Sequence, residues 1–581
     1  VPWDNAGFAY ADVLLDPITG ESGHGQAYIT SVFGFSGKAR ARALLRAMTE
    51  LAESKKDDKK GLAALRLGVP FLETAPACQI DPQTFAQQMA HGLQEVLASD
   101  ELTDEAVLRV SQDYVRETVA HEVGHVLGLR HNFAGSLAAT LSRKELDAWF
   151  RDYIAGKPLE AYTNKLASSS MMEYTVFKGA VFVGWRIRTT KEPLPHDRAA
   201  IAYGYLNSTE ARDQKMLFAT DQDTGRYGDV RTFDYGTNPV VNAYEEIAQV
   251  IELLPNNLVE TFISATAPRN EHDRIPIAEV NLNYAGYANQ MANHFADMLS
   301  WFRAETRSLR VENGFEFVGD LNRKERFEAH WKYLNSQIEK LGGVDRAAFA
   351  FLPLDLKLEL KQEPAGVAVV QRVSATNLLA KLEKLLDSEN YKTFVGLDEK
   401  KHSFSKEDRE LILKRAKKFF EELEKEVVKQ VCQRLTNAPR TLGSEAVGST
   451  GEEDIVAKLE QRIIEMSKLV ITAKDDGKRI EGKVDKGYVD VVTYRYDQDT
   501  RLAAARALDD KTGSFKGWAE DAKSDLNTQM KNDVEAALNL SHFKDFKVSL
   551  LSRPLREWYQ KQQEVLALLP PAPGNPTLPA R

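Results

Sequence analysis

The chain has 581 residues, a formal net charge of −9, 43% hydrophobic residues and only two cysteines. This length and apolar content suffice for two to four globular domains with buried cores. The negative charge argues against a nucleic-acid-binding protein, which needs a basic face, and two cysteines exclude a disulfide scaffold. No apolar run approaches the roughly 18–20 residues needed to cross a bilayer.

The chain begins Val1-Pro2-Trp3, with no initiator methionine and without the basic and apolar regions of a signal peptide. We therefore expect it to be a processed or excised product. The two cysteines, Cys78 and Cys432, are far apart in sequence, and whether they pair stays open.

The first predicted elements are two strands, over residues 8–15 and 26–33. Asp16-Pro17 and Thr19-Gly20 between them indicate a turn. Residues 38–67 and 83–98 are helical in character, so we expect a helical insertion over about residues 35–100.

Residues 103–128 predict a longer helix. Thr103 or Asp104 suits the N-cap, and Gly128 suits the residue that ends the helix. Further on, the run GAVFVGWRI at residues 179–187 favours a strand or a hairpin arm.

After about Asn242 the pattern predicts helix almost throughout. In residues 405–435, apolar residues recur at steps of three and four and form one stripe on a charged rod, which is typical of a helix packed in a bundle; they are Ile412, Ala416, Phe419, Leu423, Val427 and Val431.

The sequence HEVGHVLGLRH, residues 121–131, carries a candidate metal site. His121 and His125 are four residues apart, so on a helix they project from one face and both reach a single ion at about 2.0–2.1 Å. Glu122 stands beside that ion instead of on it, close enough to take a proton from a water.

Gly128 follows three residues after His125. A glycine there lets the helix end in a left-handed turn, so that the chain swings back and His131 supplies a third nitrogen. Three protein ligands leave one position for water, as a catalytic zinc site requires, whereas a structural zinc is closed by four ligands. The long pattern HExxHxxGxxH is specific, where HExxH alone would be weak.

A second element tests this reading. Metalloproteases with the long motif carry a tight turn containing methionine below the metal. Forty residues on, SSSMMEYTV contains Ser170, Met172 and Tyr174. Met171 competes with Met172 for this structural role, and the order of residues before the tyrosine favours Met172.

With these motifs the chain resembles a metzincin, in particular the large bacterial zinc-dependent metalloproteases with a long helical C-terminal region. The zinc motif continues as His131-Asn132-Phe133, as in that group, and residues 196–205 (HDRAAIAYGY) and 220–240 are also similar. Glu173 replaces the usual aspartate of the methionine turn, and His196 replaces a tyrosine.

The resemblance implies an α+β fold. We expect a metzincin-like catalytic domain over residues 1–240, a helical region over 241–436, a flexible linker over 437–454, a second helical region over 455–570 and a disordered tail over 571–581. Only two strands precede the zinc helix, where a metzincin has about five, so the first strands would come from an upstream segment of the same precursor. The family also implies a secreted, periplasmic or cell-surface location.

By resemblance, His121, His125 and His131 would bind Zn²⁺, Glu122 would be the general base, and Tyr174 would be a distant fifth ligand or a donor to the oxyanion. Asp197 is a structural carboxylate in this reading. The implied activity is hydrolysis of protein or peptide substrates by a zinc-activated water. The alternative is a catalytically silent metzincin fold whose helical half carries a binding or scaffold function.

Overall fold

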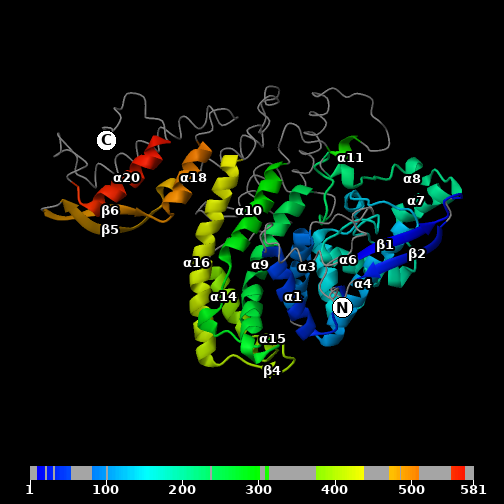
Figure 1. The fold of residues 1–581 in the computed structure, drawn as a ribbon, viewed down its shortest axis with the longest axis horizontal. Helices are drawn as coiled ribbons and strands as arrows, with labels where there is room; N and C mark the ends of the chain where they lie inside the picture. Colours follow the sequence, from blue (N-terminus) through cyan, green and yellow to red (C-terminus); the bar gives the residue numbers. More distant parts are fainter. Residues whose placement is uncertain are drawn as a thin grey trace.

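The computed structural model of the chain describes residues 9–19, 22–29, 33–53, 82–99, 102–224, 226–235, 239–300, 308–312, 375–437, 467, 470–483, 486–508 and 551–568. Across these residues the fold is α+β and mainly helical, with antiparallel two-stranded sheets as its β-structure. Figure 1 shows the region of the histidine motif on one side, a bundle of long helices in the middle and a hairpin at the opposite end.

The N-terminal region begins with a β-hairpin. Strands β1 (Ala9–Leu15) and β2 (Ser22–Ile29) pair antiparallel, with Ala9 opposite Ile29. In the turn between them, Asp16 Oδ1 accepts hydrogen bonds from the N–H groups of Ile18 (2.7 Å) and Thr19 (3.1 Å). The two predicted strands and their turn are confirmed, although β2 begins four residues earlier than we expected.

Helices make up the rest of this region. They are α1 (Lys38–Glu53), α3 (Pro82–Leu97), α4 (Asp104–Val126), α5 (Arg143–Ile154), α6 (Phe177–Thr190), α7 (Pro195–Leu206) and α8 (Glu210–Asp213). The apolar faces of α1, α3, α5 and α6 form one core with α4, the long helix that carries the first two histidines.

The helix α4 confirms the predicted helix and its two ends. Thr103 is the N-cap, and its Oγ1 accepts a hydrogen bond from Ala106 N at 3.1 Å. Asp104 and Glu105 follow in the first turn, where negative charge is favourable. Beyond Val126 the chain leaves the helix through Gly128, whose φ of +85° lies in the left-handed region.

The prediction of a strand at residues 179–187 is wrong, because these residues lie within helix α6. An apolar run that is buried on all sides does not distinguish strand from helix by its periodicity. Gly184 is what lets α6 approach α4 closely: a Cβ there would lie 1.8 Å from Asp113 O. Arg188 strengthens the same contact, since its guanidinium donates to both carboxylate oxygens of Asp113 at 3.0 and 2.9 Å.

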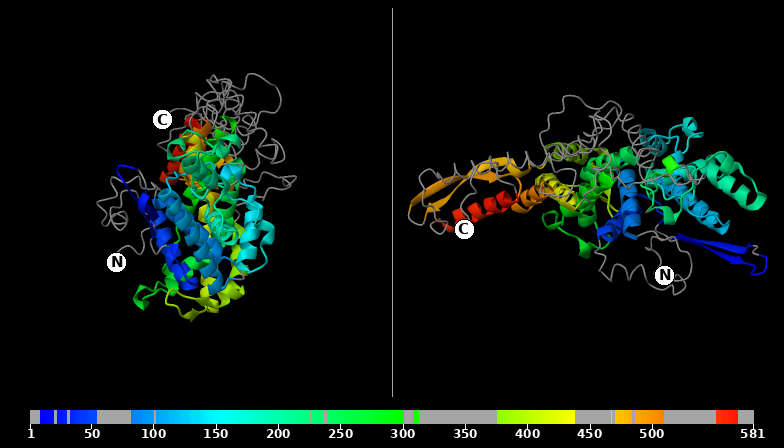
Figure 2. Two further views of the ribbon diagram at one scale, coloured as in Figure 1. Left: turned by 90° about the vertical axis from the view of Figure 1, so that its right-hand side faces the viewer. Right: turned by 90° about the horizontal axis from the view of Figure 1, so that it is seen from above.

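The middle of the molecule is a bundle of long helices, α9 (Pro239–Thr266), α10 (Tyr284–Ser300), α14 (Ala375–Leu386) and α16 (Lys406–Asn437). They run side by side in Figure 1 and stay together in both views of Figure 2. All six residues of the predicted α16 stripe lie in the bundle core, with at most 3% of each exposed. Apolar packing therefore defines this region.

An ion pair joins the bundle to the N-terminal region. Arg42 of α1 donates to both carboxylate oxygens of Glu260 of α9, at 2.7 and 3.1 Å, and to Val395 O. Tyr391 Oη donates to the same carboxylate at 3.1 Å. Both charged side chains are only 4% exposed.

The stretch 455–570, which we expected to be helical, contains a β-hairpin. Strands β5 (Lys474–Lys483) and β6 (Lys486–Tyr494) pair antiparallel and extend to one end of the molecule (Figure 2). Helices α18 (Gln498–Leu508) and α20 (Arg553–Ala567) lie beside the hairpin, and Trp558 Nε1 of α20 donates to Val492 O at 2.9 Å. The β-branched and aromatic residues of β6 are the signal that the helical prediction overlooked.

Short elements complete the described chain: α11 (Leu309–Glu312), α15 (Glu389–Lys392), β3 (Phe394–Val395) and β4 (Lys401–His402). The predicted linker beyond residue 437, the tail at 571–581 and Cys78 lie outside the described residues, so their predictions stay open. Cys432 is buried in the bundle core. None of the helices described here combines the length and the apolar character that crossing a membrane requires.

Candidate metal centre

Three histidine side chains converge at the C-terminal end of α4. One ring nitrogen each of His121, His125 and His131 lies within 4.8 Å of the others, and the Nε2 atoms of His125 and His131 are 3.2 Å apart. His121 and His131 are buried, at 4% and 5% exposure. The structure therefore brings together the three predicted ligands in a cluster that is able to hold a metal ion.

The end of α4 explains how the third histidine arrives. Gly128 N donates to His125 O at 2.9 Å, and Leu129 N donates to Gly124 O at 3.0 Å. These two bonds close the helix while the positive φ of Gly128 turns the chain back. His131 then faces the helix that it has just left.

Backbone carbonyls orient the first two rings. His121 Nδ1 lies 2.7 Å from Met171 O, and His125 Nδ1 lies 2.9 Å from Leu129 O. A carbonyl only accepts hydrogen bonds, so each Nδ1 must carry the proton and each Nε2 keeps its lone pair. The Nε2 of His121 is buried with no hydrogen-bond partner in the described structure, which is what a ligand atom for a metal requires.

The third ring is oriented by a carboxylate. His131 Nδ1 lies 2.9 and 3.1 Å from the two oxygens of Asp221. Burial opposes ionisation of this carboxyl, yet the nearby His131 ring lowers the pKa of Asp221 below its ordinary value. Asp221 therefore accepts from the Nδ1–H as a charged group.

The electrostatics of the cluster favour neutral imidazoles. Desolvation by burial lowers the pKa of all three histidines, that of His121 most strongly. Neighbouring rings lower the pKa of His121 and His125 further, whereas Asp221 partly opposes the effect of burial at His131. Metal binding needs the neutral form, because a protonated nitrogen has no lone pair to donate. The site is thus prepared to bind a cation without first losing protons.

Glu122 follows His121 on the helix and points away from bulk solvent. Its side chain is 2% exposed, and Oε2 has no hydrogen-bond partner within the part of the chain that the structure describes. Burial raises the pKa of this carboxyl to about 7. A carboxyl group of that pKa is suited to accept and return a proton near neutral pH.

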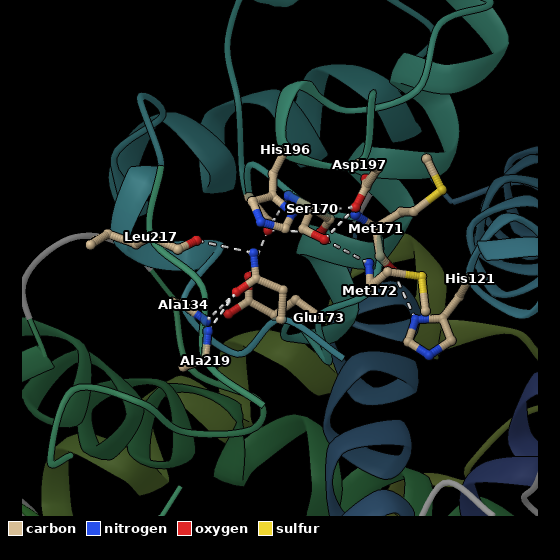
Figure 3. A network of polar contacts seen from close by, with 12 residues as sticks. His121, Ala134, Ser170, Met171, Met172, Glu173, His196, Asp197, Leu217 and Ala219 are labelled. Atoms are coloured by element: carbon tan, nitrogen blue, oxygen red, sulfur yellow. Dashed lines mark hydrogen bonds and ion pairs between the residues drawn. The ribbon is translucent and has the colours of Figure 1, made fainter. Parts of the chain in front are cut away.

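Residues 168–174 form a turn beneath the histidines, and Figure 3 shows its polar contacts. Asp197, at the start of α7, holds it from below: one carboxylate oxygen accepts from Ser170 Oγ at 2.5 Å and the other from Met171 N at 2.7 Å. Asp197 is 1% exposed. The expected structural role of Asp197 fits these contacts.

The two methionines of the turn have different structural roles. Met171 supplies the carbonyl that orients His121. Met172 packs its side chain against α4, where a Cβ on Gly124 would lie 2.2 Å from the Met172 sulfur. Asn132 N donates to Met172 O at 2.9 Å and ties the turn to the segment after the third histidine.

Glu173, in place of the aspartate expected from the resemblance, is buried at 1% exposure. Its carboxylate accepts from Ser168 Oγ at 2.6 Å, and burial together with nearby Asp234 raises its pKa well above the ordinary value. Asp234 itself accepts from Ser136 Oγ at 2.9 Å. Glu173 and Asp234 are thus two buried carboxyl groups that act on each other electrostatically below the turn.

Tyr174 also reaches the cluster. Its Oη lies 2.8 Å from His131 Nε2, and its ring stacks near His121 with centroids 5.3 Å apart. A phenol at this place lines the site and can donate a hydrogen bond into it. The residues predicted from sequence for the site therefore lie close together around the histidine cluster: His121, Glu122, His125, His131, Met172 and Tyr174.

Sequence reasoning missed the groups that orient the histidines. Asp221 lies within the similar segment 220–240, but its distance of 90 residues from His131 concealed their contact. The carbonyls of Met171 and Leu129 leave no signal in a sequence, because every residue has a carbonyl. The available clue was the position of Asp221 inside the segment 220–240, which is similar to the family.

Three nitrogen donors with oriented outer nitrogens and a carboxyl group beside them suit Zn²⁺, which takes three protein ligands in catalytic sites. Residues 103–299, which include the whole cluster, match a family model described as Met-zincin. No curated protein and no solved structure matches the chain.

Proposed function

We propose that the chain is a zinc-dependent endopeptidase acting on protein or peptide substrates, because residues 103–299 match a family model described as Met-zincin. The family suggests a zinc metallopeptidase, and the internal cleavage of chains is our proposal. The observation that carries it is the buried, partnerless Nε2 of His121 facing two further imidazoles, with Glu122 next to it.

His121, His125 and His131 would hold the ion, each through the nitrogen opposite the one that its carbonyl or carboxylate partner occupies. Bound there, Zn²⁺ would supply a Lewis acid that polarises the scissile carbonyl and acidifies the attacking water.

Glu122 would be the general base. Its free Oε2 accepts the proton of the attacking water, and the carboxylic acid so formed returns the proton to the leaving amine. The low exposure of the group keeps bulk water away from that proton.

Tyr174 would donate a hydrogen bond from its phenolic hydroxyl to the oxyanion, the substrate oxygen on which negative charge develops. Its hydroxyl already lies within hydrogen-bond distance of the cluster. Met172 would serve as the structural methionine, since it fills the space beside Gly124 and so supports α4 from below.

The test is cleavage of casein and of a peptide library by the full-length protein, with and without a chelator. Glu122→Gln keeps the size and polarity of the side chain but removes the base, so we expect kcat to fall by about 10²–10⁴-fold while Zn²⁺ still binds. Glu105→Gln, the same change at an exposed position of α4, is the matched control and leaves the rate unchanged.

Stoichiometric Zn²⁺ binding without cleavage of any peptide by the unmutated protein would overturn the proposal. That result would favour the scaffold function, in which the helical half carries the interaction. Cleavage that persists in Glu122→Gln would instead remove Glu122 from the mechanism.

A further inference from the structure

Within the residues that the structure describes, the outer nitrogen of His131 lies against a carboxylate, whereas those of His121 and His125 lie against backbone carbonyls. Asp221 Oδ1 and Oδ2 lie 2.9 and 3.1 Å from Nδ1, so both carboxylate oxygens face one N–H. The histidine is 5% exposed and the aspartate side chain 47% exposed. The carboxylate thus covers the outer side of a ring whose inner side faces the cluster.

The difference from the other two histidines is one of charge. His121 and His125 donate to neutral carbonyls. A carboxylate accepts a stronger hydrogen bond and draws the Nδ1 proton toward itself, which makes the opposite nitrogen a better electron donor. The third histidine also stands on an irregular segment and not on α4, so it has the greatest need of an external anchor.

The loop that carries Asp221 is held against the segment after His131. Phe133 N donates to Ala219 O at 2.8 Å, and Ala219 N donates to Asn132 Oδ1 at 3.1 Å. Asn132 Nδ2 donates to Leu217 O at 3.3 Å. Leu217 and Ala219 are labelled at the left of Figure 3, where dashed lines mark their two contacts with the Asn132 side chain.

A neighbour of Asp221 fixes its direction further. Thr220 Oγ1 donates to Asp221 Oδ2 at 3.2 Å. His131 thus receives its partner from a loop 90 residues away, and Asn132 and Phe133, the two residues that follow it, hold that loop by hydrogen bonds.

We propose that Asp221 is a positioning residue for the metal centre: its carboxylate accepts the Nδ1–H of His131 and thereby directs Nε2 at the ion. Asn132 holds the loop that bears Asp221 in place through its side-chain hydrogen bonds. The inference rests on the proposed function only in that the three imidazoles bind a metal. It is independent of whether peptides are cleaved.

The experiment measures Zn²⁺ affinity of the full-length, metal-stripped protein by competition with a chromophoric chelator. We expect Asp221→Ala to weaken binding by about 10–100-fold, and Asp221→Asn, which keeps an acceptor oxygen without the charge, to fall in between. Asp223→Asn is the matched control: it removes a carboxylate charge from the same loop, keeps an oxygen that can accept from Thr220 N and does not touch His131, so we expect it to bind Zn²⁺ as the unmutated protein does.

A spectroscopic readout separates positioning from mere folding. The ¹⁵N chemical shifts of His131 in the metal-free protein should report a proton on Nδ1, and Asp221→Ala should yield a mixture of tautomers while the thermal unfolding midpoint stays the same. Asp221→Asn provides the same comparison if the alanine variant does not fold.

Unchanged Zn²⁺ affinity in both Asp221 variants would overturn the proposal, as would an equal loss of affinity in Asp223→Asn, which would assign the effect to the loop as a whole. Because the readout contains no peptide, loss of the proposed peptidase activity would leave this result intact, and the two ideas fail separately.

Discussion

The region of the histidines and the helical bundle are held together by different forces. Around the metal centre, segments far apart in sequence meet through polar contacts, such as Asp197 on the methionine turn and Asp221 on His131. In the bundle, long helices meet through apolar stripes such as that of α16.

This difference follows from what each region must do. Hydrogen bonds between specific atoms fix directions, which ligand nitrogens need, whereas apolar burial stabilises without fixing a single geometry. We therefore expect changes in the bundle to alter stability and changes near the turn to alter the metal centre.

The largest effect should come from Phe420→Ala in the bundle. Phe420 is fully buried in the core of α16 and its neighbours, and such a truncation typically costs about 3–5 kcal/mol. Denaturant unfolding of the full chain measures the loss, with the exposed Lys417→Ala as control. The Zn²⁺ affinity of the folded variant should not change, and a parallel loss of affinity would show that the two regions are not separable.

An intermediate effect concerns the buried carboxyl pair below the methionine turn. Burial raises the pKa of Asp234 to about 8, so between the unfolded pKa near 4 and that value the folded state holds a proton that the unfolded state has released. The contribution to stability is present below pH 4 and is lost as the pH rises toward 8, with a slope of up to about 1.4 kcal/mol per pH unit.

Asp234→Asn removes the titratable carboxyl group while keeping an oxygen that accepts from Ser136. Measured from pH 5 to 8, the unfolding free energy of the variant should fall less steeply than that of the unmutated protein. Equal slopes would contradict the raised pKa. The other charged groups that act on Asp234 are Arg231, Glu246, Asp229 and Glu173.

The smallest effect should come from the cap of α4. Thr103→Ala removes the oxygen that accepts from Ala106 N, which typically costs about 1 kcal/mol. Thr103→Ser keeps that oxygen and should restore the loss in thermal unfolding. A serine variant as unstable as the alanine variant would mean that the methyl group, and not the cap, matters at this position.

The cluster of three histidines could be predicted from sequence because its geometry is local. Two histidines four residues apart and a glycine three residues later determine one helix face and one turn. The α16 stripe was predictable for the same reason, as its period is a property of a single helix.

Other features depended on distant partners and were not predictable. Helix α6 was mistaken for a strand because its burial comes from α4, which Gly184 contacts at Asp113. The role of Asp221 depends on a loop folding back over 90 residues. The β5–β6 hairpin was overlooked because β5 is rich in charged residues, which resemble an exposed helix in composition.

The buried pair of Arg42 and Glu260 has a consequence for how the two regions move. Separating α1 from α9 would break a guanidinium–carboxylate pair that is almost fully buried, a change that typically costs several kcal/mol. A hinge at this contact would have to break the pair each time it opened. We therefore expect the N-terminal region and the helical bundle to keep one relative position.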